Sequence, residues 1–211
     1  MKIGASAVNT APLNFDERLK EIAMFFQERD PVHKTMKRLV KRLEKAKIAY
    51  AIMGGMAVNA HGHRRTTADL DLLVTADGLA EFRRRFVPKN YDTIPQRSRR
   101  FTDRTNQVTI DFLVTGLYPG SGRPGAIAFP DPNAVAETIA EKSVVNLPTL
   151  IELKLAARRY QDFADVVSLI RIHNLDESFN DRLHPSVRRD FIECLEEKRR
   201  EDEYEARQNE P

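Results

Sequence analysis

The sequence predicts an α+β protein, because it contains both strand-like and helix-like hydrophobic patterns, and these occur in different parts of the chain. Short runs at 68–74 and 107–114 alternate apolar and polar residues, the two-residue period of strands. Longer runs at 15–28 and 31–47 place apolar residues three and four apart, which is helical spacing. After residue 148 only helical patterns follow, so we expect the strands in the earlier part and a helical part at the end.

Proline, glycine and asparagine mark the boundaries of these elements. Pro31 suits the first turn of a helix, and Arg104-Thr105-Asn106 suits the turn of a hairpin. The expected order is helices at 15–28 and 31–47, a strand at 49–53, a helix at 56–60, a strand at 68–74, a helix at 79–86, hairpin arms at 99–103 and 107–114, a Pro/Gly loop at 119–125, and helices from 148, from 162 to 172 and from 185.

Three parts of the chain follow from this order. Residues 1–30 form a loose N-terminal arm and a helix, residues 31–146 form the core, and residues 147–211 form a helical C-terminal subdomain. A chain of 211 residues is long enough for one domain with such an appended part.

Composition narrows the class of protein without identifying it. The chain is 41% hydrophobic and 31% charged, with a net charge of +3. Cys194 is the single cysteine, which excludes an intramolecular disulfide and a cysteine-rich zinc site. No run approaches the ~20 apolar residues of a membrane span. We therefore expect a cytoplasmic protein with no membrane partner.

Three aspartates are the first candidates for chemistry. Asp69 and Asp71 are two apart on an expected strand, so their side chains point the same way. Asp111 lies on the second hairpin arm, opposite in direction to its apolar neighbours. Carboxylates that converge in this way can hold Mg²⁺ together with substrate phosphates. The alternative is that each acid simply faces water on a half-buried strand.

Two consecutive glycines precede these acids. Gly54 and Gly55 follow the strand at 49–53 and start a helix. Glycine allows a close approach of the backbone to phosphate, and the first amides of a helix favour anions. An ordinary strand-to-helix turn would have the same composition.

The joint order of these motifs resembles the DNA polymerase β-like nucleotidyltransferase superfamily. Gly54-Gly55 is followed by Gly62-His63-Arg64-Arg65-Thr66-Thr67, by Asp69-Leu70-Asp71 and by Asp111. The segment 147–157 with 162–165 is similar to the helical lysine motif of small bacterial members, which include toxin-type (abortive-infection) proteins. The resemblance spans roughly residues 50–170.

The resemblance implies a mixed β-sheet flanked by helices and transfer of a nucleoside monophosphate from a nucleoside triphosphate. It implies Mg²⁺, or Mn²⁺ in its place, on Asp69, Asp71 and Asp111, with Asp111 also able to activate the acceptor. It assigns the nucleotide, ATP among the candidates, to five residues. These are Gly54, Gly55, Arg65, Thr67 and Lys154.

Several of these roles have alternatives. Arg65 in a loop and Lys154 on a helix could instead face solvent. Asp162 could form ion pairs with Lys154 or Arg159, or could cap the following helix. The run 83–85 is expected to be a solvated face, and Arg97 to Arg100 is the better candidate for an acceptor-binding edge.

The acceptor hydroxyl stays open between RNA, protein and a small molecule. A toxin-like role would add an antitoxin partner. The competing hypothesis is a non-catalytic module that binds nucleotide or a partner on the same fold, and a weaker one is a helical interaction protein.

Overall fold

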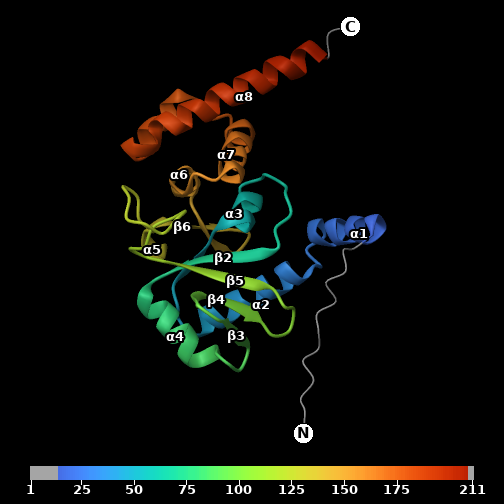
Figure 1. The fold of residues 1–211 in the computed structure, drawn as a ribbon, viewed down its shortest axis with the longest axis vertical. Coiled ribbons are helices and arrows are strands. Elements are labelled where there is room, and N and C mark those ends of the chain that lie inside the picture. Colours follow the sequence, from blue (N-terminus) through green and yellow to red (C-terminus); the bar gives the residue numbers. More distant parts are fainter. Residues whose placement is uncertain (1–13, 209–211) are drawn as a thin grey trace.

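A computed structural model describes residues 14–208, so the N-terminal arm predicted before Asn14 lies outside the described residues. Within residues 14–208, seven strands form one mixed sheet in the order β3-β4-β5-β2-β1-β7-β6 (Figure 1). Their bounds are β1 Tyr50–Ile52, β2 Asp69–Val74, β3 Tyr91–Ile94, β4 Arg97–Asp103, β5 Thr109–Val114, β6 Ala136–Ile139 and β7 Lys142–Val145.

Eight α-helices accompany the sheet in the described part of the chain. They are α1 Phe15–Phe26, α2 Pro31–Lys45, α3 Gly54–Ala60, α4 Ala76–Phe86, α5 Pro132–Val135, α6 Leu147–Ala157, α7 Tyr160–His173 and α8 Arg188–Gln208. Two short 3₁₀ turns, Glu177–Arg182 and Pro185–Val187, join α7 to α8. The α+β class predicted from the sequence is confirmed.

The central strands are those that carry the predicted aspartates. β2 and β5 run parallel, and Asp71 is the register partner of Asp111. β1 lies antiparallel on the other side of β2, and β4 lies antiparallel on the other side of β5. In this order, β4 lies beside β5, β5 lies beside β2, and β2 lies beside β1. The two strands that carry the aspartates are therefore flanked by the 99–103 arm on one side and by β1, which leads into α3, on the other.

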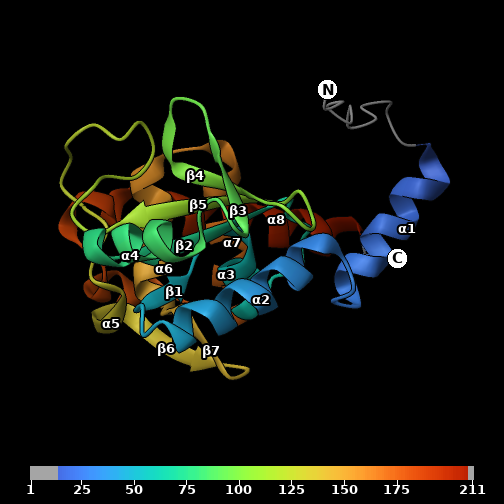
Figure 2. The same ribbon diagram turned by 90° about the horizontal axis from the view of Figure 1, so that it is seen from below.

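One face of this sheet is apolar and packs on α2 and α4 (Figures 1 and 2). The Phe82 ring of α4 lies 4.6 Å from the Phe112 ring and 5.2 Å from the Phe101 ring, measured between centroids. Removing so large a buried ring costs about 3–5 kcal/mol. Because side chains alternate along a strand, burying Phe112 on this face turns Asp111 to the other.

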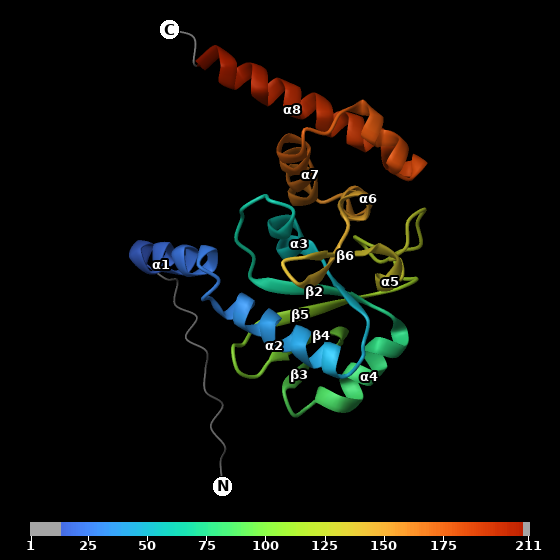
Figure 3. The same ribbon diagram turned by 180° about the vertical axis from the view of Figure 1, so that it is seen from behind.

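The opposite face lies toward α6 and α7, with α8 packed on α7 (Figures 1 and 3). Four leucine and isoleucine side chains of α6 are buried, at positions 150, 151, 153 and 155. α6 is therefore buried on most sides. Its C-terminal end lies near the strands that carry Asp71 and Asp111.

Three strands and one helix were absent from the sequence-based expectations. β3, β6, β7 and α5 are each only four residues long. Such short segments give too few periods for a pattern to be recognised, and their pairing depends on neighbouring strands. No helix among residues 14–208 is long and apolar enough to cross a membrane.

Candidate active site

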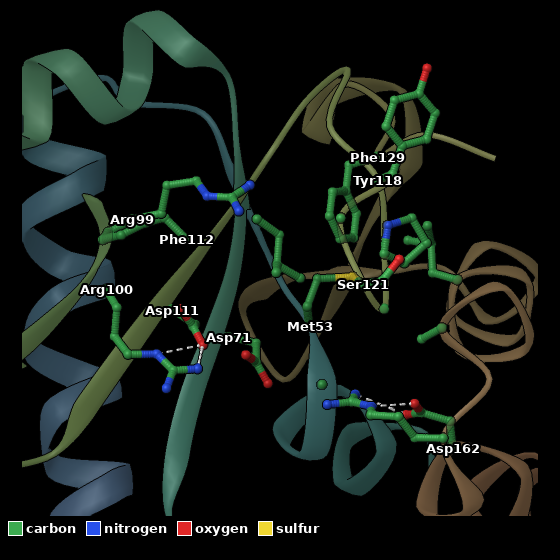
Figure 4. Close-up of a pocket in the computed structure, with 18 of the residues that line it drawn as sticks. Met53, Asp71, Arg99, Arg100, Asp111, Phe112, Tyr118, Ser121, Phe129 and Asp162 are labelled. Atoms are coloured by element: carbon green, nitrogen blue, oxygen red, sulfur yellow. Dashed lines mark hydrogen bonds and ion pairs between the residues drawn. The ribbon is translucent and has the colours of Figure 1, made fainter. Parts of the chain in front are cut away.

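A cavity of about 440 Å³ opens on the acidic face of the sheet (Figure 4). Its floor includes Asp71 and Asp111 from β2 and β5. β4 forms one wall, and the 118–122 loop with α6 forms the opposite wall. The start of α3 and the start of α7 complete it through Gly54 and Arg159.

Gly54 lies directly against the carboxylate of Asp71. Its φ is +58°, and a Cβ at this position would lie 1.9 Å from Asp71 Oδ2. The backbone N–H of Met53 also donates to the carbonyl oxygen of Asp71 at 3.0 Å. Only glycine allows both this left-handed backbone and this close approach. The close approach that Gly54 makes in the structure is to Asp71, and its predicted approach to a phosphate stays a prediction.

Asp71 has a strongly raised pKa. Burial, and then the neighbouring carboxylates of Asp69 and Asp111, raise the pKa of Asp71 to about 7. Desolvation and like charge both disfavour the ionised form. A carboxyl group in this condition gains most from a cation placed beside it.

Asp111 is already paired with a cation. Arg100 is its register partner on β4, and Arg100 Nε donates to Asp111 Oδ2 at 2.9 Å. A second guanidinium nitrogen donates to the same oxygen. This hydrogen bond to Asp111 raises the pKa of Arg100, although burial opposes the shift. In the described structure Asp111 therefore points to Arg100.

Asp69 lies at the beginning of β2 and is held by its own loop. Thr67 Oγ1 donates to Asp69 Oδ1 at 2.9 Å. Thr67 is also closely packed on α3, because a Cβ at Gly55 would lie 2.8 Å from Thr67 Cβ. Asn59 fixes the same loop by donating to the carbonyl oxygens of Gly55 and Arg65, at 2.9 Å and 2.7 Å. Gly55 and Thr67 thus shape the loop that presents Asp69.

The acids do not form a ready-made three-carboxylate centre. Within residues 14–208, no group of three His, Cys, Asp or Glu side chains is arranged to hold a metal ion. Asp111 instead accepts hydrogen bonds from Arg100, and Asp69 accepts one from Thr67. The oxygen donors nevertheless suit Mg²⁺, which is commonly held by one or two carboxylates plus substrate phosphates.

A network of charged side chains, which we call the buried ion network, supports the α6–α7 wall. Lys154 Nζ lies 3.1 Å from Asp162 Oδ1 and 2.6 Å from Asp165 Oδ2. Arg65 Nη2 donates to Asp165 Oδ2 at 3.0 Å, and Arg159 Nε donates to Asp162 Oδ2 at 2.6 Å. The ion-pairing alternative for Asp162 is confirmed. Its capping alternative is wrong, because Arg159 is the N-cap of α7 and no side chain caps it.

The two helix starts at the cavity differ from those of five other helices. Side chains of Asn14, Asp30, Thr75, Asp131 and Asn146 cap α1, α2, α4, α5 and α6. α3 and α7 begin without a side-chain cap, after Met53 and Arg159. Uncapped first-turn N–H groups need another acceptor. Both of these helix starts lie at the cavity.

The predicted site residues fall into two groups. Gly54, Asp71, Asp111 and Lys154 line the cavity. The others lie outside that lining: Gly55 in α3, Arg65 and Thr67 in the loop before β2, and Asp69 at the start of β2. Arg159 and Tyr118 line the cavity and were not predicted as site residues. Arg100 also lines it, and was predicted only as part of the Arg97 to Arg100 acceptor-binding edge, not as a partner of Asp111. Arg100 could have been found from the predicted hairpin, in which it lies opposite Asp111.

No family model matches the chain, and no curated protein matches it. Solved structures with a partly similar arrangement exist. A candidate nucleotidyltransferase from H. pylori is 16% identical, with 78% of this chain and 76% of that chain covered and a TM-score of 0.44. An antigenic nucleotidyltransferase-like protein from Paracoccidioides brasiliensis is 18% identical, covers 88% and 95%, and has a TM-score of 0.43.

A third structure, the CdnE cyclic dinucleotide synthase of Elizabethkingia meningoseptica with GTP and Apcpp, is 10% identical. It covers 77% of this chain and 66% of that chain, with a TM-score of 0.30. Two of the three names contain the word nucleotidyltransferase, the superfamily that the sequence motifs resemble. At these identities, and with TM-scores below 0.5, the likenesses establish neither activity nor substrate. The function has to be inferred from the chain's own residues.

Proposed function

We propose that this protein is a magnesium-dependent nucleotidyltransferase that moves a nucleoside monophosphate from a nucleoside triphosphate to an acceptor hydroxyl. The observation that carries the proposal is the Asp71 carboxyl group, desolvated against Gly54 and register-paired with Asp111 on the cavity floor. Such a carboxyl group is costly for a fold to keep unless it has a task. The order of glycines and acids supports the same reaction.

The donor phosphates would bind where α3 and α7 begin. Both helix starts lack a side-chain cap, and helix N-termini attract anions. Arg159 lies at this wall with its side chain 73% exposed, so it can turn toward a phosphate. Lys154 is only 5% exposed and is bound to two carboxylates. We propose that it holds this wall in place and adds positive potential behind the phosphates.

Asp69 and Asp71 would hold the magnesium ion, with the triphosphate supplying further oxygens. When bound, the ion would neutralise charge on the transferred phosphoryl group and on the departing pyrophosphate. It would also favour the ionised form of Asp71. The protein's contribution would be mainly positioning and charge neutralisation.

Asp111 would accept the proton of the attacking hydroxyl or complete the metal site. Either role requires at least one carboxylate oxygen that Arg100 does not occupy. Arg100 donates two hydrogen bonds to the same oxygen, Oδ2, so the other oxygen is not engaged by this pair. We propose that substrate phosphate competes for Arg100 and frees Asp111 further.

A labelled-transfer assay tests the proposal. The full-length protein is incubated with Mg²⁺, a cell lysate and each α-labelled triphosphate, and the label is located in RNA, protein or small molecules. We expect Asp71→Asn to lower transfer by at least about 10³-fold. Asp92→Asn is the matched control, because Asp92 is an exposed strand acid paired with Arg104 away from the cavity.

A second readout does not depend on the acceptor. Mg²⁺ with a triphosphate should raise the melting temperature of the wild type and of Asp92→Asn but not of Asp71→Asn. Full transfer by the Asp71→Asn variant would sink the proposal. So would a melting temperature that responds equally in all three proteins.

The alternative is a non-catalytic nucleotide-binding or partner-binding module. The hydrogen bonds between Arg100 and Asp111 favour it, since they occupy an acid that catalysis needs. A module would show the magnesium- and triphosphate-dependent thermal shift without transfer to any lysate component. A toxin role, an antitoxin partner and a cytoplasmic location rest on the sequence resemblance and composition.

A further inference from the structure

The β4 wall of the cavity carries three arginines, of which one is paired with an acid and two are not. Arg97, Arg99 and Arg100 all line the cavity. Arg100 is bonded to Asp111. In the described part of the chain, neither the Arg97 nor the Arg99 side chain has a hydrogen-bond or carboxylate partner. The cavity therefore has two cations whose charge is not matched from within the protein.

The other cations of the cavity are paired. Its lining has five basic and three acidic side chains, and the surplus lies at Arg97 and Arg99 because the other three cations are bonded to acids. The basic residues are Arg97, Arg99, Arg100, Lys154 and Arg159, and the acidic ones are Asp71, Asp111 and Asp162. Positive charge that the fold leaves unmatched at a cavity attracts anions.

The two arginines stand at the acceptor end of the site. In the strand order, the donor position at Gly54 follows β1, whereas β4 lies beyond Asp111 on the other side of β2. A hydroxyl that is activated by Asp111 while a triphosphate occupies the Gly54 end would approach past β4. Figure 4 shows Arg99 and Arg100 on this side of the acids and Asp162 on the other.

The spacing of the two arginines suits a chain of phosphates. Arg97 and Arg99 are two residues apart in β4, so their Cα atoms lie at most about 7 Å apart. Both line the cavity together with Arg100, because the β3–β4 pairing is irregular between Thr93 and Ile94 and the side chains do not alternate regularly here. Guanidinium groups bind phosphate with paired hydrogen bonds, which makes arginine a preferred phosphate ligand. Two such groups in a row match neighbouring phosphates of a polynucleotide better than a single phosphate.

An aromatic residue lies on the cavity wall opposite this strand. Tyr118 is half-buried in the loop that follows β5 and lines the same cavity. The β3–β4 hairpin and the loop after β5 project beyond the same edge of the sheet (Figure 2). Single-stranded nucleic acids are bound by a basic groove together with aromatic rings on which bases stack. Tyr118 supplies the ring that the sequence around Arg97 lacks.

We propose that Arg97 and Arg99 bind the phosphates of a single-stranded polynucleotide, whose terminal base stacks on Tyr118 and whose terminal hydroxyl reaches Asp111. This inference rests on the proposed function for the role of the hydroxyl. The binding site itself follows from the two unmatched arginines and from the tyrosine opposite them.

Fluorescence anisotropy with the full-length protein tests the site. The probes are labelled single-stranded RNA and single-stranded DNA of about twelve nucleotides, a length within the site sizes of such grooves. The test variant is Arg97→Gln with Arg99→Gln. The matched control is Arg84→Gln with Arg85→Gln, which removes two surface arginines that pair with Glu81 outside the cavity.

We expect the test variant to lose roughly 10- to 100-fold in affinity and the control to lose less than about 3-fold. The slope of log affinity against log salt should fall by about 1.4 in the test variant, for two lost phosphate contacts on a single strand. Tyr118→Leu should weaken binding by about 5- to 50-fold with an unchanged salt slope. Comparing the RNA and DNA probes identifies which polynucleotide is preferred.

Three results would overturn the inference. They are wild-type protein that binds neither probe at low salt, a test variant that binds as the wild type does, and a control that loses as much as the test variant. Failure of the proposed function looks different. In that case Asp71→Asn would leave transfer and the magnesium–triphosphate thermal shift unchanged, whatever the oligonucleotides do.

Discussion

Two groups of charged side chains meet at the cavity, and they are organised in opposite ways. In the buried ion network, Lys154 and Arg65 are both bonded to Asp165, whose side chain has 0% exposure. At the cavity floor, Asp71 has two carboxylates as neighbours and Gly54 packed against it. One group is electrostatically complete within the fold, and the other leaves an acid without a cation.

The two carboxyl groups respond to their settings with opposite shifts. Burial raises the pKa of Asp71 to about 7, and the nearby acids add to the shift. Burial also acts to raise the pKa of Asp165, but Lys154 and Arg65 outweigh it and hold the pKa below its usual value. Both side chains belong to aspartate, so the difference comes only from their neighbours. The comparison distinguishes an acid whose charge is matched within the fold from one whose charge is not.

Removing Asp165 should have the largest effect on stability. Asp165→Ala would leave Lys154 and Arg65 without their shared partner in a buried setting, at a cost of about 3–5 kcal/mol. The free energy of unfolding in urea measures it. Asp92→Ala, which removes an exposed pair with Arg104, should cost less than about 1 kcal/mol. Equal losses in the two variants would end the distinction between buried network and surface pair.

A methyl group at Gly54 should have the next largest effect. Gly54→Ala combines a left-handed backbone with a Cβ that would overlap Asp71 Oδ2, so we expect a loss of about 2–4 kcal/mol. Gly122→Ala is the control, because Gly122 has φ +75° and nothing within 4 Å of the added Cβ, which leaves only the backbone cost of about 1–2 kcal/mol. Thermal or urea unfolding of both variants isolates the contact with Asp71. No difference between them would contradict the close approach.

Asp71 and Asp165 should change the free energy of unfolding with pH in opposite directions. Without metal, the folded protein keeps the Asp71 proton up to about pH 7 while the unfolded chain loses it near pH 4, so Asp71 makes stability fall as pH rises through this window. We expect a decrease of about 1–2 kcal/mol, below the full linkage value of ~1.4 kcal/mol for each unit of pKa shift, because Asp71 lines an open cavity and is not fully buried. Urea unfolding in the presence of a chelator measures it. Asp71→Asn should remove this decrease.

Asp165 should act in the opposite direction. Its lowered pKa stabilises the folded state above about pH 4, and this contribution is lost as pH falls further. Asp165→Asn should therefore be closest to the wild type in stability at the lowest pH and furthest from it at neutral pH. A gap between the two proteins that is constant with pH would argue against the assigned ion pairs.

Truncating Arg159 should have the smallest effect on stability. Its side chain is 73% exposed, so Arg159→Ala should change the free energy of unfolding by less than about 1 kcal/mol. Affinity for a magnesium triphosphate should still fall by about 5- to 20-fold if the guanidinium turns toward phosphate. Isothermal titration measures that affinity. Unchanged affinity would leave Arg159 as a surface partner of Asp162.

Much of the sheet could be predicted from local patterns. The alternation in 68–74 and 107–114 identified β2 and β5, and the hairpin around 104–106 placed β4 beside β5. The same alternation assigned Asp71 and Asp111 to the face opposite Phe112. These features depend on neighbours a few residues away, which is the range over which sequence periodicity carries information.

The partners of the charged residues could not be predicted in the same way. Arg65 and Asp165 are 100 positions apart, and Thr35 and Asp103, which share a hydrogen bond, are 68 apart. Arg65 was assigned to the nucleotide because the resemblance places it before the acids. The structure places it against Asp165, so its predicted contact with the nucleotide remains a prediction.

The sequence by itself identified the residues that we expect to hold a triphosphate. They are the glycine pair, the acids of two strands and the lysine of the helix that begins near residue 148. Only the tertiary structure decided which of these charges are already matched. The physical reason is that the electrostatic energy of an ionisable group, and therefore its pKa, depends mainly on the groups within a few ångströms of it. Packing of α6 and α7 matched Lys154, and packing of β4 matched Asp111. The same packing left Asp71, Arg97 and Arg99 without counter-charges at one cavity.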